Sequence, residues 1–334
     1  MGDTSHWIAK TYPARREILK ILITGGAGFI ASYLIEGLIR GNKIIAYDNL
    51  TRNSLKFTDL QQHPNMELVE GDVLNYPILS NAMQGVDICI HTAAIAGLYS
   101  TSKNYLNTMK VNLLGTYYAL EACVKNNVKR FIDFSTSEVY GPFVYKGKES
   151  DYTTLGPINE KRWVYAISKL AAEHLAHTYQ EECGLEVITI RPFNIYGPRQ
   201  TIGGGAISGM VEKALKDEDV IVYNDGTQIR AWCYVTDFAD ALYEIVGIAN
   251  FKNQVFNIGN PQATITVLNL AEKILKMTDS KSRIVFRKHP GAEVDLRIPD
   301  ISLASNILNY KPKVSLEQGL RKTIDWIKFQ MKEK

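Results

Sequence analysis

The sequence contains few cysteines, and their arrangement suggests neither a disulfide framework nor a metal site. The 334 residues include four, which are widely separated and lack the CxxC or Cys/His spacing typical of zinc sites: Cys89, Cys123, Cys183 and Cys233. Three of them fall inside apolar segments. We therefore expect reduced, mostly buried thiols, as cytoplasmic redox conditions favour, and no bound metal.

Long apolar runs and a charge of one sign are also missing. The apolar runs are too short to span a bilayer, and residues 1–7 have neither the basic region nor the apolar core of a signal peptide. Lys and Arg number 38 against 35 Asp and Glu, giving a net charge of +3, and they are scattered along the chain. This composition argues against membrane insertion and nucleic-acid binding, and it favours a globular cytoplasmic protein.

A glycine-rich turn follows the first strong strand signal. Residues 18–24 are rich in branched apolar side chains, as in a parallel strand covered on both faces. Gly25 permits a tight turn, and Gly28 lets a pyrophosphate approach the backbone. Ala31 is small enough for the following helix to pack closely on the strand. The helix N-terminus then faces the phosphates, so the pattern predicts dinucleotide binding.

An acidic residue strengthens this prediction. The next strand pattern, residues 43–48, ends in Asp48, about twenty residues downstream, where a dinucleotide fold places its ribose-binding carboxylate. The charge of Asp48 would repel a 2′-phosphate, which favours NAD over NADP. Arg52 lies close enough in sequence to keep NADP as an alternative.

Strand and helix patterns alternate through the first two thirds of the chain. Strands are expected at residues 66–73, 87–94, 128–135 and 185–191, and helices at 104–126 and 165–183. This alternation predicts an α/β protein with a Rossmann-type doubly wound parallel sheet. We expect a leader at 1–17, an NAD-binding Rossmann domain at 18–195, and a smaller substrate-binding domain at 196–334, some segments of which return to the large sheet.

Two further segments carry side chains suited to catalysis. Residues 135–138, Ser-Thr-Ser-Glu, leave a strand at the predicted carboxyl edge of the sheet, where ligands bind in open α/β folds. Farther on, Tyr165 and Lys169 are spaced to share one helix face. A nearby ammonium and a positive nicotinamide favour the phenolate, so Tyr165 could remove a proton from a sugar hydroxyl. His91, inside a strand pattern, is expected to be a packed, hydrogen-bonded histidine.

Taken together, these motifs closely resemble the extended short-chain dehydrogenases/reductases, in their nucleotide-sugar epimerase/dehydratase/decarboxylase branch. The resemblance covers about residues 18 to 330. Its motifs lie at residues 24–30 (TGGAGFI), 48–50 (DNL), 71–73 (GDV), 91–94 (HTAA), 135–141 (STSEVYG), 191–199 (RPFNIYGPR), 234–237 (YVTD) and 315–320 (SLEQGL), together with Tyr165-x-x-x-Lys169.

The resemblance implies a role for each matching residue. Tyr165 would be the base, Lys169 would hold Tyr165 and the nicotinamide ribose, and Thr136 would bond the sugar O4. Ser137 and Glu138 would complete the catalytic set. Further contacts to NAD would come from Phe29, Ile30, Asn49, Asp72, Val73, Ala93 and Ala94. The nucleoside-diphosphate sugar would be held by Asn194 and Arg230, and Arg199 is a further candidate; as an arginine in a loop, it could instead be solvated.

The chemistry implied is oxidation at C4 of the sugar, which each subfamily exploits differently. Many 4,6-dehydratases resembling this chain carry Asp-Glu where this sequence has Ser137-Glu138, so their acid for water elimination is missing here. Residues 156–165 resemble the approach to the tyrosine in a bacterial UDP-glucuronate decarboxylase. Decarboxylation of a UDP-hexuronic acid is therefore placed ahead of 4,6-dehydration and 4-epimerisation. Glu138 is expected to take the C5 proton in dehydration or to supply it in decarboxylation. The alternative is a structural carboxylate bonded to backbone amides.

An alternative of another class is a non-catalytic NAD-binding sensor, since a fold does not prove an activity. The intact set of Thr136, Tyr165 and Lys169 argues against it. The family resemblance also implies a homodimer in which the helices at 104–126 and 165–183 pair with their copies. Leu113, Leu120 and Leu175 are the expected contacts.

Overall fold

A seven-stranded parallel sheet forms the centre of the protein. The computed structural model describes residues 18–97, 104–248, 254–289 and 291–332, so the predicted leader lies outside the described residues. The strands run in the order β12-β7-β5-β4-β1-β2-β3. Their bounds are β1 (Lys20–Thr24), β2 (Lys43–Asp48), β3 (Met66–Glu70), β4 (Ile88–His91), β5 (Arg130–Phe134), β7 (Glu186–Pro192) and β12 (Gln254–Ile258).

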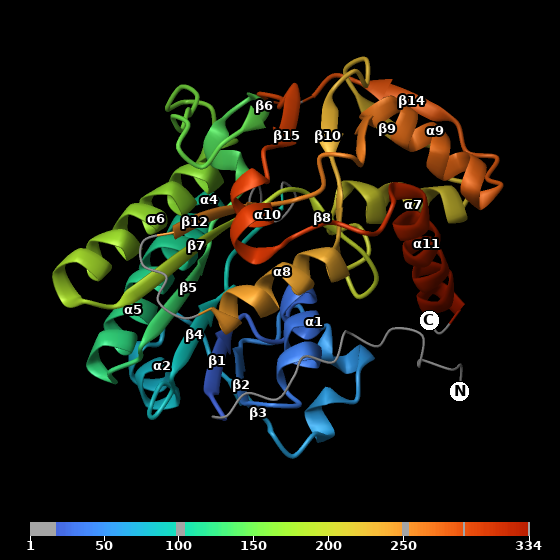
Figure 1. Ribbon diagram of the computed structural model, residues 1–334. Coiled ribbons are helices and arrows are strands. Elements are labelled where there is room, and N and C mark those ends of the chain that lie inside the picture. The colour runs from blue at the N-terminus through green and yellow to red at the C-terminus, as the bar shows by residue number, and fades with distance from the viewer. Residues whose placement is uncertain (1–17, 98–103, 249–253, 290, 333–334) are drawn as a thin grey trace.

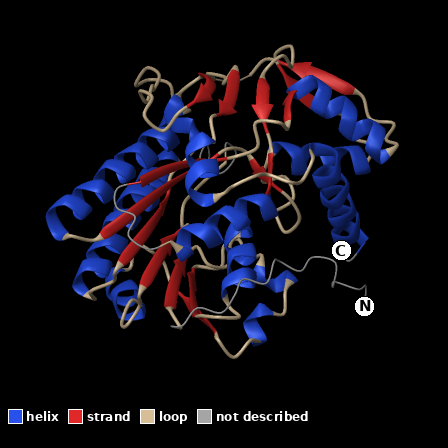
Figure 2. Cartoon of the chain, in the orientation of Figure 1, coloured by secondary structure: helices blue, strands red, loops and turns tan. Residues whose placement is uncertain are grey.

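Helices cover both faces of this sheet, as Figures 1 and 2 show. One face carries α1 (Phe29–Leu38) and α8 (Val235–Gly247). The other carries α2 (Tyr76–Ala82), α5 (Gly115–Lys125) and α6 (Trp163–Cys183). Successive residues of β1 point to opposite faces: Ile21 and Ile23 pack with the first group, whereas Leu22 packs with the second. The predicted doubly wound α/β fold is therefore confirmed.

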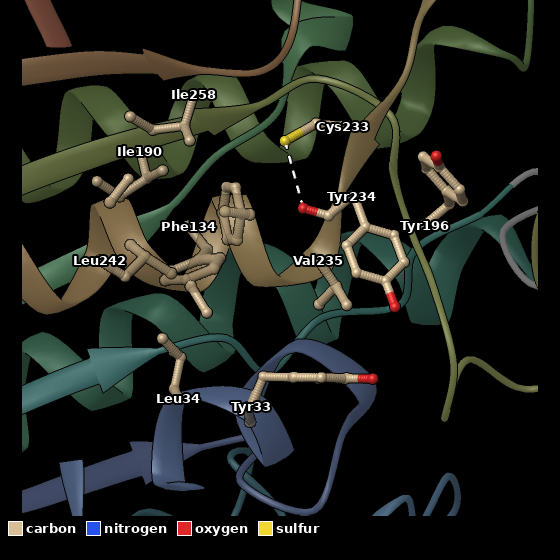
Figure 3. Close-up of a cluster of buried hydrophobic side chains, with 14 of the residues drawn as sticks. Tyr33, Leu34, Phe134, Ile190, Tyr196, Cys233, Tyr234, Val235, Leu242 and Ile258 are labelled. Atoms are coloured by element: carbon tan, nitrogen blue, oxygen red, sulfur yellow. Dashed lines mark hydrogen bonds between the residues drawn. The ribbon is translucent and has the colours of Figure 1, made fainter. Parts of the chain in front are cut away.

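The core on the α1/α8 face joins distant parts of the chain. Figure 3 shows Leu34 of α1, Phe134 of β5 and Leu242 of α8 converging, with Ile258 of β12 beside them. All four side chains are buried, and each removes apolar surface from water. Residues after 195 thus complete the core of the large sheet.

A smaller layer of strands lies beyond the carboxyl ends of the large sheet. Its four-stranded sheet has the order β13-β10-β15-β6, and β8 pairs with β11 and β9 with β14. The strands are β6 (Phe143–Gly147), β8 (Ile195–Tyr196), β9 (Val220–Tyr223), β10 (Ile229–Ala231), β11 (Cys233–Tyr234), β13 (Thr264–Thr266), β14 (Ile284–Arg287) and β15 (Leu296–Pro299). The remaining helices of this half are α7 (Ala206–Leu215), α9 (Val267–Thr278), α10 (Ser302–Leu308) and α11 (Leu316–Lys332).

Segments cross between the two parts in both directions. Strand β12 lies in the large sheet, and β6, which precedes residue 195, pairs with β15 in the small one. The division of the chain into two domains at residue 195 stays a prediction.

The helix expected at 104–126 is divided. It consists of α4 (Tyr105–Met109), a π-helical turn at Lys110–Leu114 and α5. The π turn contains Asn112, whose side chain is buried. Its Oδ1 accepts a hydrogen bond from Ile95 N, and its Nδ2 donates to the Ile95 carbonyl and to Ser168 Oγ, the latter at 3.1 Å. Asn112 therefore fixes the loop after β4 against α6, a role that sequence reasoning missed.

Candidate active site

The turn between β1 and α1 has the geometry of a phosphate-binding loop. Gly25 has a φ of +67°, and a Cβ there would lie 2.7 Å from the Ala93 nitrogen. Gly28 caps α1 without any side chain, so the positive end of the helix dipole, at Phe29 and Ile30, is free of a competing acid. These residues fit the pyrophosphate of a dinucleotide.

Asp48 lies at the carboxyl end of β2 beside this turn. Its Oδ2 accepts a hydrogen bond from Ala27 N at 3.0 Å, and its Oδ1 accepts one from Leu50 N at 2.7 Å. Burial raises the pKa of the carboxyl, and the two N–H groups oppose that rise. Asp48 is thus held at the strand end where dinucleotide-binding folds place their ribose-binding carboxylate.

The other predicted cofactor residues follow neighbouring strand ends. Asn49 follows β2 and is exposed, Asp72 and Val73 follow β3, and Ala93 and Ala94 follow β4. Strands β4, β1, β2 and β3 are adjacent in the sheet, and the chain reverses direction across the sheet between β4 and β1. Ligands of open α/β sheets bind at such a switch point. The described residues contain no His, Cys, Asp or Glu cluster that could hold a metal.

Thr136 and Tyr165 meet at the end of β5. Thr136 caps the short 3-10 turn Ser137–Tyr140, where Ser137 is buried, and its side chain interacts with that of Tyr165. Burial raises the pKa of Tyr165 to about 12; the Thr136 side chain opposes this, while the Glu138 carboxylate adds to it. Tyr165 therefore needs additional positive charge nearby to act as a base at neutral pH.

Lys169 lies one helical turn after Tyr165, as its spacing predicted. The side chain is buried, and its Nζ makes no hydrogen bond within the described part of the chain. A buried ammonium with unused donors suits the hydroxyls of a nicotinamide ribose. The other residue near this point, His91, is packed as expected: its ring nitrogens bond Thr24 and Thr116, and burial lowers its pKa to about 3.

Glu138 is held between two arginines. Arg162 Nη2 donates to both carboxylate oxygens at 3.3 Å, and Arg297 Nη1 donates to Oε1. Burial alone would raise the pKa of Glu138, but these guanidinium groups lower it to about 2. Such a carboxylate has no proton to donate at neutral pH and is a weak base. The structure therefore favours an arginine-holding role over the acid–base role expected for Glu138.

Sequence reasoning missed both arginines. Arg162 lies just before α6, in the segment already noted for its resemblance to a decarboxylase. Arg297 comes from β15 and belongs to none of the motifs identified in the sequence. Both are buried, yet Nε and Nη1 of Arg162 and Nε of Arg297 have no hydrogen-bond partner in the described residues. Buried, unpaired guanidinium donors are costly unless a ligand satisfies them.

The predicted substrate residues divide into two groups. Asn194 has a φ of 45° and donates to the Ala231 carbonyl at 2.9 Å, next to Arg230 on β10. Arg230 pairs with Glu293 at 3.2 Å, and burial lowers its pKa to about 10.

Arg199 is engaged elsewhere. It forms two hydrogen bonds, at 3.0 and 3.1 Å, with Glu36 of α1 and lies over the Tyr33 ring. The structure thus ties it to α1, and the phosphate-binding role expected for Arg199 loses support.

The contact of Glu138 with Arg162 and Arg297, called the arginine clamp below, should contribute to the free energy of unfolding. Glu138→Gln is expected to lower the free energy of unfolding by about 2 to 3 kcal/mol at pH 7, because two buried guanidinium groups lose their counter-charge. The pKa of Glu138 lies below its ordinary value of 4.5, so this stabilisation is present above pH 4.5 and is lost as the pH falls toward 2.

Urea denaturation at several pH values measures this difference. Glu317→Gln, at an exposed ion pair, is the matched control and should change stability by less than about 1 kcal/mol. An equal effect of the two substitutions would contradict the clamp.

Comparison with known proteins agrees with this geometry. Residues 21–259 match the model of the NAD dependent epimerase/dehydratase family. The chain belongs to this family. It is an NAD-dependent enzyme that acts on nucleotide sugars, and the predicted cofactor is confirmed.

The relatives include both decarboxylases and epimerases. UDP-glucuronic acid decarboxylase 1 of Arabidopsis thaliana is 37% identical over 313 residues, covering 92% of this chain and 70% of that protein. UDP-N-acetyl-alpha-D-glucosaminuronate decarboxylase of Bacillus cytotoxicus is 34% identical, covering 92% and 98%. The UDP-glucuronic acid 4-epimerase of Bacillus cereus, solved with UDP-glucuronic acid and NAD, superposes with a TM-score of 0.84 at 30% identity, covering 93% and 100%.

Proposed function

We propose that this family member decarboxylates a UDP-hexuronic acid after transient oxidation at C4. The observation that carries the proposal is that Arg162, while it binds Glu138, keeps two buried donors, Nε and Nη1, without a partner in the described residues. Each unused guanidinium donor can form a charge-assisted hydrogen bond to a carboxylate oxygen. A neutral hexose would leave these donors unpaired, whereas a hexuronate supplies a carboxylate for them.

The residues present can perform each protein-assisted step. Thr136 bonds O4, and Tyr165 accepts the O4 proton. The β1–α1 turn, Asp48 and Lys169 would hold NAD, which would supply the hydride acceptor for C4. The C4 ketone then stands β to the carboxylate, so the C5–C6 bond can break with its electron pair passing to the C4 oxygen as carbon dioxide leaves. A proton added at C5 restores the ketone.

Glu138 moderates the arginines in this scheme. A carboxylate bound by two uncompensated guanidinium groups would be stabilised in the ground state, which slows its loss as carbon dioxide. The negative charge of Glu138 offsets part of that attraction. Its pKa of about 2 makes the C5 deprotonation required for dehydration unfavourable, which supports decarboxylation over dehydration.

Product masses test the proposal. The enzyme should be incubated with UDP-glucuronate, UDP-N-acetylglucosaminuronate, UDP-glucose and UDP-N-acetylglucosamine, and with GDP and TDP counterparts. We expect loss of carbon dioxide from a UDP-hexuronate. Loss of water from a neutral sugar would establish a dehydratase instead, and conversion without a mass change would establish a 4-epimerase, the activity named for the Bacillus cereus relative.

The same proposal includes a cytoplasmic location and, as argued in the next paragraph, a homodimer. All four cysteines are free, and Cys89 and Cys123 are both buried without a disulfide, which suits a reducing compartment. Among the described residues, no helix has the length and apolar character needed to cross a bilayer.

The outer surface of α4, the π turn and α5 supports the dimer. It exposes large apolar side chains: Leu106, Leu114, Tyr117 and Val124. The predicted contact Leu120 is instead fully buried in the core of the large sheet, because it lies on the opposite face of α5. Leu113 and Leu175 are half-buried.

A substitution on this surface should separate the protomers. At micromolar concentration, light scattering should give a dimer mass for the wild type and a monomer mass for Leu114→Asp, because a charge at the centre of an apolar interface is poorly tolerated. Phe286→Asp, at an exposed position on β14, should remain dimeric. A monomeric wild type, or a dimeric Leu114→Asp, would contradict the interface.

A further inference from the structure

A buried carboxyl group that the proposed reaction does not use lies behind Lys169. Asp133, on β5, is fully buried, and its Oδ1 is 3.9 Å from Lys169 Nζ. Neither carboxylate oxygen accepts a hydrogen bond within the described part of the chain. A buried carboxylate without hydrogen bonds is costly to maintain, so its position beside the catalytic ammonium calls for an explanation.

The other titratable groups around Asp133 are either uncharged or already paired with another group. Its neighbours on the adjacent strands are His91 on β4 and Thr189 on β7, and Thr189 in turn bonds His177 of α6. His91 is uncharged at neutral pH. On α6, Glu173 binds the Arg191 guanidinium of β7 through two hydrogen bonds, at 3.0 and 2.8 Å. The groups that remain are Lys169 and Tyr165.

Asp133 and Lys169 therefore form a pair with little net charge. Burial raises the pKa of Asp133 to about 6, Lys169 lowers it and Glu173 raises it. The carboxyl is thus ionised at and above neutral pH and opposes the ammonium. Its charge also raises the pKa of Tyr165.

We propose that Asp133 is a positioning residue that offsets the charge of Lys169, so that Tyr165 gives up its proton only when an oxidised nicotinamide adds a further positive charge. The phenolate is then formed in the NAD⁺ complex and suppressed in the NADH complex. This inference depends on Tyr165 as the base and does not depend on which sugar is bound.

The ionisation of Tyr165 tests the inference directly. Carbon-13 NMR of labelled tyrosine Cζ, assigned by comparison with Tyr165→Phe, should be followed against pH in the NADH and NAD⁺ complexes. In the wild type, we expect Tyr165 to titrate at a clearly lower pH with NAD⁺ than with NADH. Asp133→Asn should lower the pKa of Tyr165 in the NADH complex by at least about one pH unit, because one negative charge is removed within a buried site.

The pH dependence of turnover gives a second readout. In Asp133→Asn, the acidic limb of the pH profile of kcat should move to lower pH by about as much as the pKa of Tyr165 falls, since the phenolate forms more readily. A residue that only supports the fold would lower the melting temperature without moving this limb. The matched control is Asp237→Asn, another buried aspartate, whose carboxylate bonds the Val314 backbone; it should leave the limb in place.

An unchanged or higher Tyr165 pKa in Asp133→Asn would overturn the inference. If this variant does not fold, the wild type alone decides: titration of Tyr165 at the same pH in the NADH and NAD⁺ complexes would also refute it. Loss of the decarboxylase assignment would leave both measurements valid, because neither depends on carbon dioxide release.

Discussion

Tyr165→Phe is expected to retain NAD and the native fold while losing at least about 10²-fold in turnover. The hydroxyl removed is the group that accepts the O4 proton, and the phenyl ring left behind preserves the packing at the start of α6. The cofactor-binding turn is formed by other elements, so NAD affinity should change little. Tyrosine-to-phenylalanine exchange also leaves the Asp133–Lys169 pair intact.

Steady-state turnover and NAD titration on the same preparation measure both properties. Tyr152→Phe, at a position that is 97% exposed, is the matched control and should remain fully active. Turnover of Tyr165→Phe at the wild-type rate would rule out Tyr165 as the base.

Arg162→Met is expected to reduce kcat/KM for a UDP-hexuronate by about 10²- to 10³-fold, the range for removing one partner of a buried charge pair. Methionine keeps much of the apolar stem and removes the guanidinium group. The loss should be far smaller for a neutral analogue such as UDP-glucose, measured as an inhibitor. The preference of the enzyme for the UDP-hexuronate over UDP-glucose should therefore be largely lost.

Comparing the loss in kcat/KM for the UDP-hexuronate with the loss in inhibition by UDP-glucose separates carboxylate recognition from a general loss of stability. Arg283→Met, at a side chain that is 82% exposed, should leave the ratio of these two quantities unchanged. If Arg162→Met kept the wild-type preference for the hexuronate, Arg162 would not be the carboxylate-binding residue, and the proposal would lose its main support.

The parts of the site that were predictable from sequence are those encoded by local patterns. The turn at Gly25 and Gly28 lies between a strand and a helix, and Asp48 ends the next strand, so both fall at one sheet edge. Tyr165 and Lys169 share a helix face by spacing alone. These placements follow from backbone geometry and need no knowledge of tertiary contacts.

The parts that were missed depend on contacts between distant segments. Arg297 meets Glu138 only because β15 pairs with β6, which follows the 3-10 turn after β5. The ionisation state of Glu138 is set by this contact, so its role could not be read from the Ser137-Glu138 motif. Likewise, residue spacing placed Leu120 on a helix without showing which face of α5 meets the sheet.

The measurement that tests the central claim most directly is conversion of UDP-glucuronate in deuterated water. We predict loss of carbon dioxide and a UDP-pentose or UDP-4-ketopentose carrying one solvent deuterium at C5, because the C5–C6 electron pair is quenched there by a solvent-derived proton. A product that retains C6, with or without inverted C4, would contradict decarboxylation at this site.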